Sequence, residues 1–147
     1  MIRSIFLLVC LITTFNLQAE EKKTNLKFMD IKEAISSDLY KKAITSKIPY
    51  YFGDEKHPEI DKTLTEASST RKINVTVKFG NNSCIAAFLE TLAALQKTAE
   101  GYKADAIVNI QSNFEGNTLD SSNNYLCDPG FFVAGVGLKA DVVTFKK

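Results

Sequence analysis

The chain contains a single histidine, and carboxylates crowd the residues around it. His57 lies between Asp54 and Glu59 in the segment 54–61, which reads DEKHPEID. An imidazole close to carboxylates can ligate a transition metal or act in an acid–base pair. The same segment also suits an exposed turn, because Pro58 restricts the backbone and the charges are simply solvated. We favour the turn and keep Asp54, His57 and Glu59 as the candidate polar site of the alternative.

Other catalytic patterns are missing from the sequence. A serine or cysteine nucleophile needs a base close to it, and His57 is the only imidazole in the chain. The sequence has no Gly-x-Ser-x-Gly turn to expose such a serine, and no Gly-x-x-x-x-Gly-Lys-Ser/Thr loop to hold a phosphate. We therefore predict that the protein is not an enzyme and that it carries no cofactor and no metal.

A second candidate for binding is the stretch 112–124, which is rich in Asn, Ser and Gly. A set of asparagines in and beside it, flanked by two aromatic residues, can form a polar binding rim: Asn109, Asn113, Asn117, Asn123 and Asn124 with Phe114 and Tyr125. The same composition is typical of an ordinary flexible loop, which we favour. Further along, Gly135 and Gly137 are expected to allow a bulge or a close backbone approach rather than to cradle a phosphate.

The first nineteen residues predict export. Arg3 precedes an unbroken apolar run over residues 5–12, and the small residue Ala19 stands ahead of a charged stretch. This run is shorter than the roughly 20 residues that span a bilayer, but it is typical of a signal peptide. We expect cleavage after Ala19 and a periplasmic or secreted protein with no membrane span. Cys10 lies inside the apolar run, which disfavours a lipid anchor at that position.

Two cysteines, Cys84 and Cys127, remain after this cleavage, and they allow one intramolecular pairing in an oxidising compartment. We predict that disulfide. The two positions are 43 residues apart, and closing a loop of that length stabilises a fold by about 4 kcal/mol on the chain-entropy model. A redox-active pair is more typically close in sequence, as in Cys-x-x-Cys, so we expect a structural bond.

Length and charge limit the choice of partners. Cleavage leaves 128 residues (147 − 19), which suits a flexible leader over 20–26 and a single domain over 27–147. The chain has 18 basic and 17 acidic residues, and the loss of Arg3 makes the mature protein neutral, with 17 of each. Such a charge balance does not attract the protein to nucleic acid or anionic lipid.

Hydrophobic periodicity predicts the secondary structure. Alternation over residues 73–79 indicates a strand, and apolar residues spaced by three and four from Asn82 to Gly101 indicate a long helix, with polar residues such as Gln96 facing elsewhere. Asn82 or Ser83 is expected to cap this helix at its start and Gly101 at its end. Further expected elements are one or two short helices after Asp30 and strands at 48–52, at 104–111, from 125 and within 130–145. The polar residues 61–71 give no clear signal.

These elements predict an α+β fold, in which one long helix packs on a mainly antiparallel sheet, with one or two short N-terminal helices. The crossover through the long helix also allows the strands 73–79 and 104–111 to form a parallel pair. Phe132 and Val133 are expected among the core residues of the last strand. Cys127, on a strand, is expected to pin the first turn of the long helix through Cys84.

Several motifs together resemble a family of small exported bacterial proteins of unknown function: YFGD at 51–54 with HP at 57–58, Cys84 with LAALQ at 92–96, ADAIVNI at 104–110, Cys127, and AGVGLKA at 134–140. Members often carry the label "excinuclease ATPase subunit", although this sequence has neither a phosphate loop nor a zinc-finger cysteine set. More distantly, the long helix followed by ADAIVN is similar to the helix–strand unit of the heavy-metal-binding-like YbjQ family and of the Rcs envelope-stress lipoprotein. The chain lacks that lipoprotein's lipobox and second cysteine pair.

Three hypotheses follow. The leading one is an exported, disulfide-stabilised, non-enzymatic domain of the bacterial envelope that binds an unknown envelope protein or itself. The alternative is a metal-binding or hydrolytic protein that uses the segment around His57. The third is an envelope-stress or redox sensor, which requires Cys84 and Cys127 to cycle between thiol and disulfide.

Overall fold

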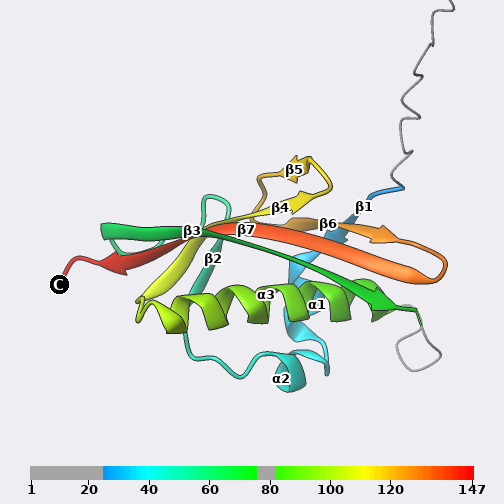
Figure 1. Ribbon diagram of the computed structural model, residues 1–147, viewed down its shortest axis with the longest axis horizontal. Helices are drawn as coiled ribbons and strands as arrows, with labels where there is room; N and C mark the ends of the chain where they lie inside the picture. Colours follow the sequence, from blue (N-terminus) through cyan, green and yellow to red (C-terminus); the bar gives the residue numbers. More distant parts are fainter. Residues whose placement is uncertain (1–24, 76–81) are drawn as a thin grey trace, which may run out of the picture.

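The computed structural model describes residues 25–75 and 82–147 (Figure 1). Their elements follow in the order β1 (Lys27–Asp30), α1 (Ile31–Ser36), α2 (Tyr40–Ala43), β2 (Tyr50–Phe52), β3 (Ile60–Asn74), α3 (Ser83–Gly101), β4 (Ala106–Phe114), β5 (Asn117–Leu119), β6 (Asn124–Pro129) and β7 (Val133–Phe145). The expected export signal and most of the expected leader lie outside this part of the chain. Within the described ranges, no helix is both long and apolar enough to cross a membrane.

The long helix α3 lies across one face of the sheet, as the sequence predicts (Figure 1). Phe88, Leu92 and Leu95 are fully buried, whereas Glu90 and Lys97 on the other side of the helix are exposed. Burying each of these apolar side chains stabilises the fold by roughly 1.5–3 kcal/mol. The spacing of three and four thus both forms the helix and determines which side contacts the sheet. The α+β fold is confirmed.

Two details of α3 differ from the prediction. Gln96, which was expected to lie on the polar side of the helix, is fully buried. Its Nε2 donates a hydrogen bond at 2.6 Å to the carbonyl oxygen of Ile48, in the segment that leads into β2. The helix also continues through Gly101 before it is capped. Lys103 takes up the left-handed conformation (φ 53°), and Ala104 N donates to Ala99 O at 3.0 Å, which closes the last turn without glycine.

The described part begins with β1, which the sequence did not predict, and continues with the short helices expected after Asp30. Asp30 caps α1, because its side chain accepts a hydrogen bond from Glu33 N at 3.1 Å. Ile31 and Ala34 of this short helix are buried, and α2 follows it after a short turn. The two helices pack near α3 on the same side of the sheet (Figure 1).

Seven strands of the described residues form one curled, mostly antiparallel sheet. The neighbour order is β1-β6-β7-β4-β2, with β3 attached to β7 and β5 attached to β4. The centre is β7: β3 pairs with it from Ile60↔Phe145 to Asn74↔Val133, and β4 and β6 pair with parts of its other edge. The parallel pair that the crossover allowed between 73–79 and 104–111 is not formed by the described residues, because Ile73 and Asn74 pair with β7, as does β4. The parallel pair is instead β2 with β4.

Two glycines let β7 approach its neighbours closely. A Cβ on Gly137 would lie 2.1 Å from the carbonyl oxygen of Asn113, and one on Gly135 would lie 2.5 Å from the ring of Phe114. The expected close backbone approach is therefore confirmed. The irregularity in this part of the sheet lies on β4, whose register against β7 shifts around Asn109, a non-glycine residue with φ 52°.

Apolar residues pack on both faces of the sheet. The main core lies between α3 and the sheet, and a small cluster on the opposite face contains Ala106, Val108 and Val143. Tyr51 and Phe145 cover this second cluster. Alternate residues of β4 therefore enter different clusters, as the pleat of a strand requires.

The strand β3 is where the sequence was least informative. It covers residues 61–71, for which the sequence gave no clear signal. Of the strand predicted over 73–79, the first two residues lie in β3, and residues 76–79 lie outside the described part. Only Ala67 and Ile73 of β3 are buried, so its apolar alternation is too weak to recognise.

Candidate functional site

The only histidine lies against aromatic rings. The His57 ring is centred 5.6 Å from Tyr51 and stacks on Phe145 at 6.1 Å. Its Nδ1 lies 2.8 Å from the carbonyl oxygen of Pro58, which places a proton on Nδ1 as the donor. The imidazole therefore packs the loop after β2 against Tyr51 and Phe145, which cover the second apolar cluster.

The carboxylates of the candidate polar site make separate contacts. Asp54 lies in the turn after β2 and is exposed, while Glu59 forms an ion pair with Lys146. Glu55 turns back to accept a hydrogen bond from Phe52 N at 2.6 Å. The structure thus brings His57 to aromatic neighbours and sends Glu59 to the C-terminal segment. Within residues 25–75 and 82–147, no three His, Cys, Asp or Glu side chains converge as a metal site would need.

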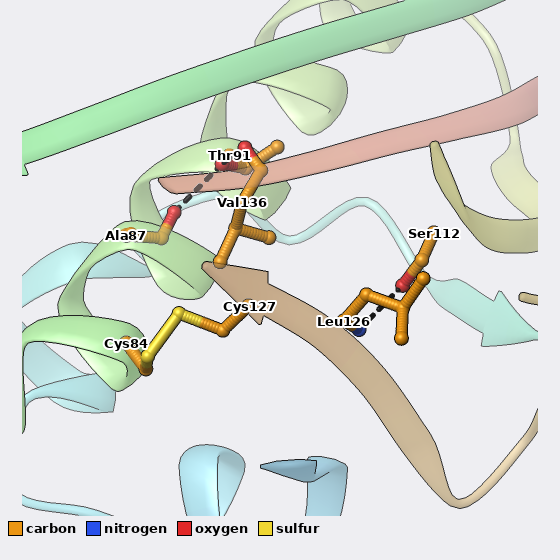
Figure 2. The surroundings of a disulfide bond; sticks show 7 residues. All are labelled: Cys84, Ala87, Thr91, Ser112, Leu126, Cys127 and Val136. Carbon is orange, nitrogen blue, oxygen red and sulfur yellow. Dashed lines mark hydrogen bonds between the residues drawn. A yellow bond between two sulfur atoms is a disulfide. The ribbon is translucent and has the colours of Figure 1, made fainter. Parts of the chain in front are cut away.

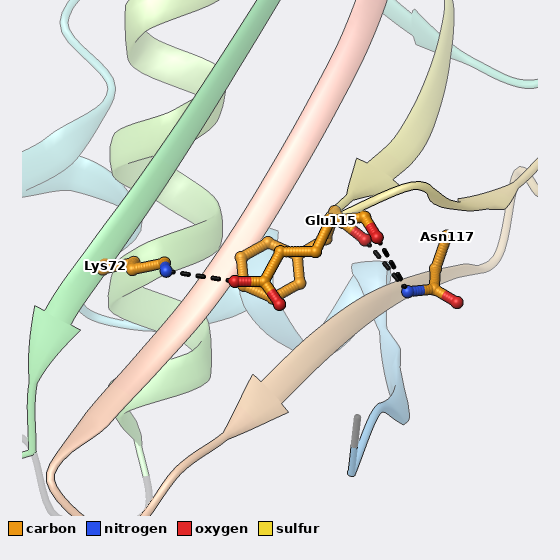
Figure 3. Close-up of polar contacts among 4 residues, drawn as sticks. Lys72, Glu115 and Asn117 are labelled. Atoms are coloured by element: carbon orange, nitrogen blue, oxygen red, sulfur yellow. Dashed lines mark hydrogen bonds and ion pairs between the residues drawn. The ribbon is translucent and has the colours of Figure 1, made fainter. Parts of the chain in front are cut away.

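The expected polar rim is largely occupied by local hydrogen bonds. Asn117 Nδ2 donates to the carbonyl oxygens of Phe114 and Glu115 at 3.2 and 3.4 Å, which shapes the β4–β5 turn (Figure 3). Asn124 Nδ2 reaches Met29 O at 3.4 Å and so links β6 to β1. The stretch also contains β5 and the end of β4, so the expected loop is shorter than predicted.

The two aromatic residues expected beside this rim are both in the interior. Phe114 and Tyr125 are each 1% exposed. Tyr125 stacks on Phe88 with the ring centroids 4.1 Å apart, and its hydroxyl has no hydrogen-bond partner among the described groups. Burial raises the pKa of Tyr125 far above its ordinary value, with smaller contributions from Glu33 and Asp30. This hydroxyl therefore stays protonated at neutral pH.

A small polar hollow lies beside the irregularity in β4. Glu66, Gln111 and Lys139 contribute to its wall, and its volume is about 110 Å³. Asn109 Nδ2 donates to Asp141 Oδ2 at 3.3 Å, and Gln111 Nε2 donates to Asn109 Oδ1 at 2.7 Å. Asn109, Gln111 and Asp141 in the hollow are therefore already hydrogen-bonded to one another.

The predicted disulfide is present. Cys84 in the first turn of α3 is bonded to Cys127 on β6, with the two Cα atoms 5.9 Å apart (Figure 2). Near the bond, the buried Thr91 Oγ1 donates to Ala87 O at 2.6 Å. The disulfide therefore links the first turn of α3 to β6, as expected from the placement of Cys127 on a strand.

An apolar tip stands at the end of the molecule where the disulfide lies. Phe131 and Phe132, in the turn between β6 and β7, are 85% and 75% exposed, and Val133 and Val75 beside them are also exposed. Val75 N donates to Phe132 O at 2.8 Å, which joins the end of β3 to this turn. We call these four residues the apolar tip. The expectation that Phe132 and Val133 lie in the core is wrong, because the turn extends beyond the helix (Figure 1).

The apolar tip borders a hollow. Val75, Cys84, Gly130 and Ala134 contribute to a depression of about 340 Å³ between the β6–β7 turn and the start of α3. Its lining is more apolar than that of the hollow at Asn109. An exposed aromatic pair beside an apolar depression is the arrangement that protein contact surfaces use. The sequence contained the signal in consecutive phenylalanines after Pro129 and Gly130, but apolarity alone did not separate a core residue from a surface one.

Comparison of the chain with family models, with curated proteins and with solved structures gives no match.

Proposed function

We propose that this protein is an exported, non-enzymatic binding domain of the bacterial envelope, which contacts an envelope protein or another copy of itself through the apolar tip. The observation that carries the proposal is the exposure of Phe131 and Phe132 in one projecting turn. Burial of these two rings against a partner would be favourable by roughly 25 cal/mol per Å² of apolar surface removed from water. The aromatic pair thus supports a role in contact rather than in catalysis.

The surroundings of the tip support the same role. The two rings meet edge to face with centroids 4.7 Å apart, so they present one joint apolar surface. The Cys84–Cys127 bond fastens β6 to α3 just ahead of the turn. A disulfide at this place is consistent with an oxidising compartment, which the expected export signal also implies. A partner would therefore meet a braced surface and pay little ordering entropy on binding.

The test is site-specific photocrosslinking in cells that produce the protein. A benzophenone amino acid is introduced at Phe132 and, as the matched control, at Tyr102, an exposed aromatic residue at the opposite end of α3. We expect one discrete adduct from position 132 and none of the same mass from position 102. Phe131→Ser should reduce the yield at position 132, because it removes half of the apolar pair.

The mass of the adduct identifies the partner as another protein or as a second copy of this chain. No discrete adduct from position 132, or the same adducts from both positions, would contradict the proposal. Variants that fail to accumulate are recognised by the absence of the intact disulfide-bonded protein on a non-reducing gel.

A further inference from the structure

One long edge of the sheet carries no partner strand among the described residues. β3 has 15 residues and pairs only with β7. Its first part is interrupted, because the register against β7 shifts between Ile60 and Lys62 and between Thr63 and Thr65. From Thr65 to Asn74 the register is regular and the strand contains no proline. Register shifts and prolines are devices that keep sheet edges from pairing, and this second part has neither.

Its backbone polar groups point alternately toward β7 and away from it. Val75 N donates to Phe132 O, so odd-numbered residues of the regular part direct their N–H and C=O groups toward β7. Even-numbered residues, including Glu66 and Thr70, direct theirs outward. The carbonyls of these two residues accept only from side chains, from Thr65 Oγ1 at 3.2 Å and from Arg71 at 3.3 Å. The edge is therefore open to another strand.

The sequence of this edge is complementary to itself. Ala67 and Ile73 face α3, so even-numbered residues lie on the other face of the sheet. When two copies pair antiparallel about a two-fold axis through Ser69, Glu66 of each lies opposite Lys72 of the other on that face. Opposite charges in directly facing positions stabilise a strand pair, and shifting the pairing by two residues separates them.

Lys72 is placed to make this contact. Its Nζ already pairs with Glu115 at 3.1 Å, and its side chain remains 55% exposed (Figure 3). It also lies 5.8 Å from the centre of the Phe114 ring, which holds the ammonium group near the sheet. A second carboxylate, from Glu66 of another copy, can reach the exposed side of this ammonium group.

We propose that two copies of this protein associate through β3, whose regular part pairs antiparallel with the same part of the second copy about an axis at Ser69, and so join their sheets into one. The inference goes beyond the proposed function, because it adds a second contact surface, β3, to the apolar tip. The occupant is a second copy because the edge offers complementary charges to itself.

The register is tested by cysteine crosslinking of the oxidised protein purified from producing cells. Ser69→Cys puts two sulfur atoms on the axis in a pair without backbone hydrogen bonds, where Cβ atoms lie about 4.5–5.5 Å apart. Ser68→Cys and Thr70→Cys are the matched controls, because each lies opposite the other and not opposite itself. We expect mild oxidation to give a covalent dimer from Ser69→Cys and far less from either control.

The edge itself is tested by Ser68→Pro. Proline is tolerated where a strand directs its N–H away from the sheet, so each subunit keeps its fold and only pairing is lost. We expect sedimentation to show a dimer for the unsubstituted protein and for Ser68→Ala, and a dissociation constant raised at least about tenfold for Ser68→Pro. If Ser68→Pro fails to fold, as judged by circular dichroism, the Ser69 crosslink alone decides.

A protein that sediments as a monomer at all accessible concentrations overturns the inference, as does equal crosslinking at positions 68, 69 and 70. A dimer that survives Ser68→Pro in folded form also overturns it. Failure here leaves the proposed function intact if the adduct at Phe132 persists. Loss of that adduct while the β3 dimer remains would overturn the role of the apolar tip instead.

Discussion

Removing the disulfide is the most quantitative test of how this fold is stabilised. The bond joins residues 43 apart in sequence, so the unfolded chain without it gains the freedom of a loop of that length. The chain-entropy relation gives about 4 kcal/mol for such a loop at 25 °C. Folded domains of this size have only about 5–15 kcal/mol of stability in total. We therefore expect the Cys84→Ala/Cys127→Ala variant to keep the fold but to lose a large part of its stability.

The measurement is urea unfolding of the oxidised protein and of the double variant, followed by circular dichroism at one pH. We expect the free energy of unfolding to fall by about 4 kcal/mol and the dependence on urea to steepen, because the unlinked unfolded chain exposes more surface. A fall below about 1 kcal/mol would refute the reasoning, since it would mean that the unfolded chain remains compact without the bond.

The same samples test whether the bond can act as a sensor. Cys127 is fully buried and Cys84 is 5% exposed, so a thiol reaches the sulfur atoms only when the structure opens. We expect mild thiol to leave the bond intact in buffer and to reduce it quickly in urea, as read by alkylation and intact mass. Rapid reduction in buffer would contradict the structural role and favour the redox-sensor hypothesis.

Two further changes probe the interior by urea unfolding. Tyr125→Phe removes a buried hydroxyl without a described partner, so we expect stability at pH 7 to stay the same or to rise by about 1 kcal/mol. Because burial raises the pKa of Tyr125, only the unfolded state releases the Tyr125 proton near pH 10. The contribution of this group to stability is therefore full below about pH 10 and falls above it, so Tyr125→Phe should lose less stability at pH 10.5 than the unsubstituted protein. Equal alkaline losses would contradict this. Gly137→Ala should lower the free energy of unfolding by about 2–3 kcal/mol, because the new Cβ meets the Asn113 carbonyl. Gly101→Ala, where the new Cβ has open space, should raise the free energy of unfolding by up to about 1 kcal/mol. Similar values for the two variants would show that β7 moves freely.

How far the sequence predicts this fold depends on how much of each element is buried. α3 was predictable because a helix packed along one side repeats its apolar residues at a fixed spacing. The pairing of Cys84 with Cys127 followed because only these two cysteines remain after the expected signal cleavage. β3 was not predictable, because an edge strand with Ala67 and Ile73 as its only buried residues has almost no apolar alternation. Its pairing with β7 arises from contacts distant in sequence, which local patterns do not contain.

The candidate sites show a different limit. His57 attracted attention as the only imidazole, yet the structure places it on the Tyr51 and Phe145 rings, and the contact with Phe145 joins chain segments far apart in sequence. Phe132 of the apolar tip was wrongly predicted to be buried, because a phenylalanine in an apolar stretch usually indicates a core residue. Residue type shows what a side chain is able to do, and only the fold shows whether water or protein surrounds it.

The disulfide and the apolar tip are linked through the chain. Cys127 precedes Phe131 by only four residues, and the bond ties that part of β6 to the start of α3, which also borders the hollow beside the tip. A reduced chain would lose this brace at the place where the two phenylalanines project, so their ordering on a partner would cost more conformational entropy. β3 is held along its length by β7 and needs no such brace. In the proposed exported protein, formation of the disulfide would therefore strengthen binding through the tip more than pairing through the edge, and contacts through the tip would follow oxidation.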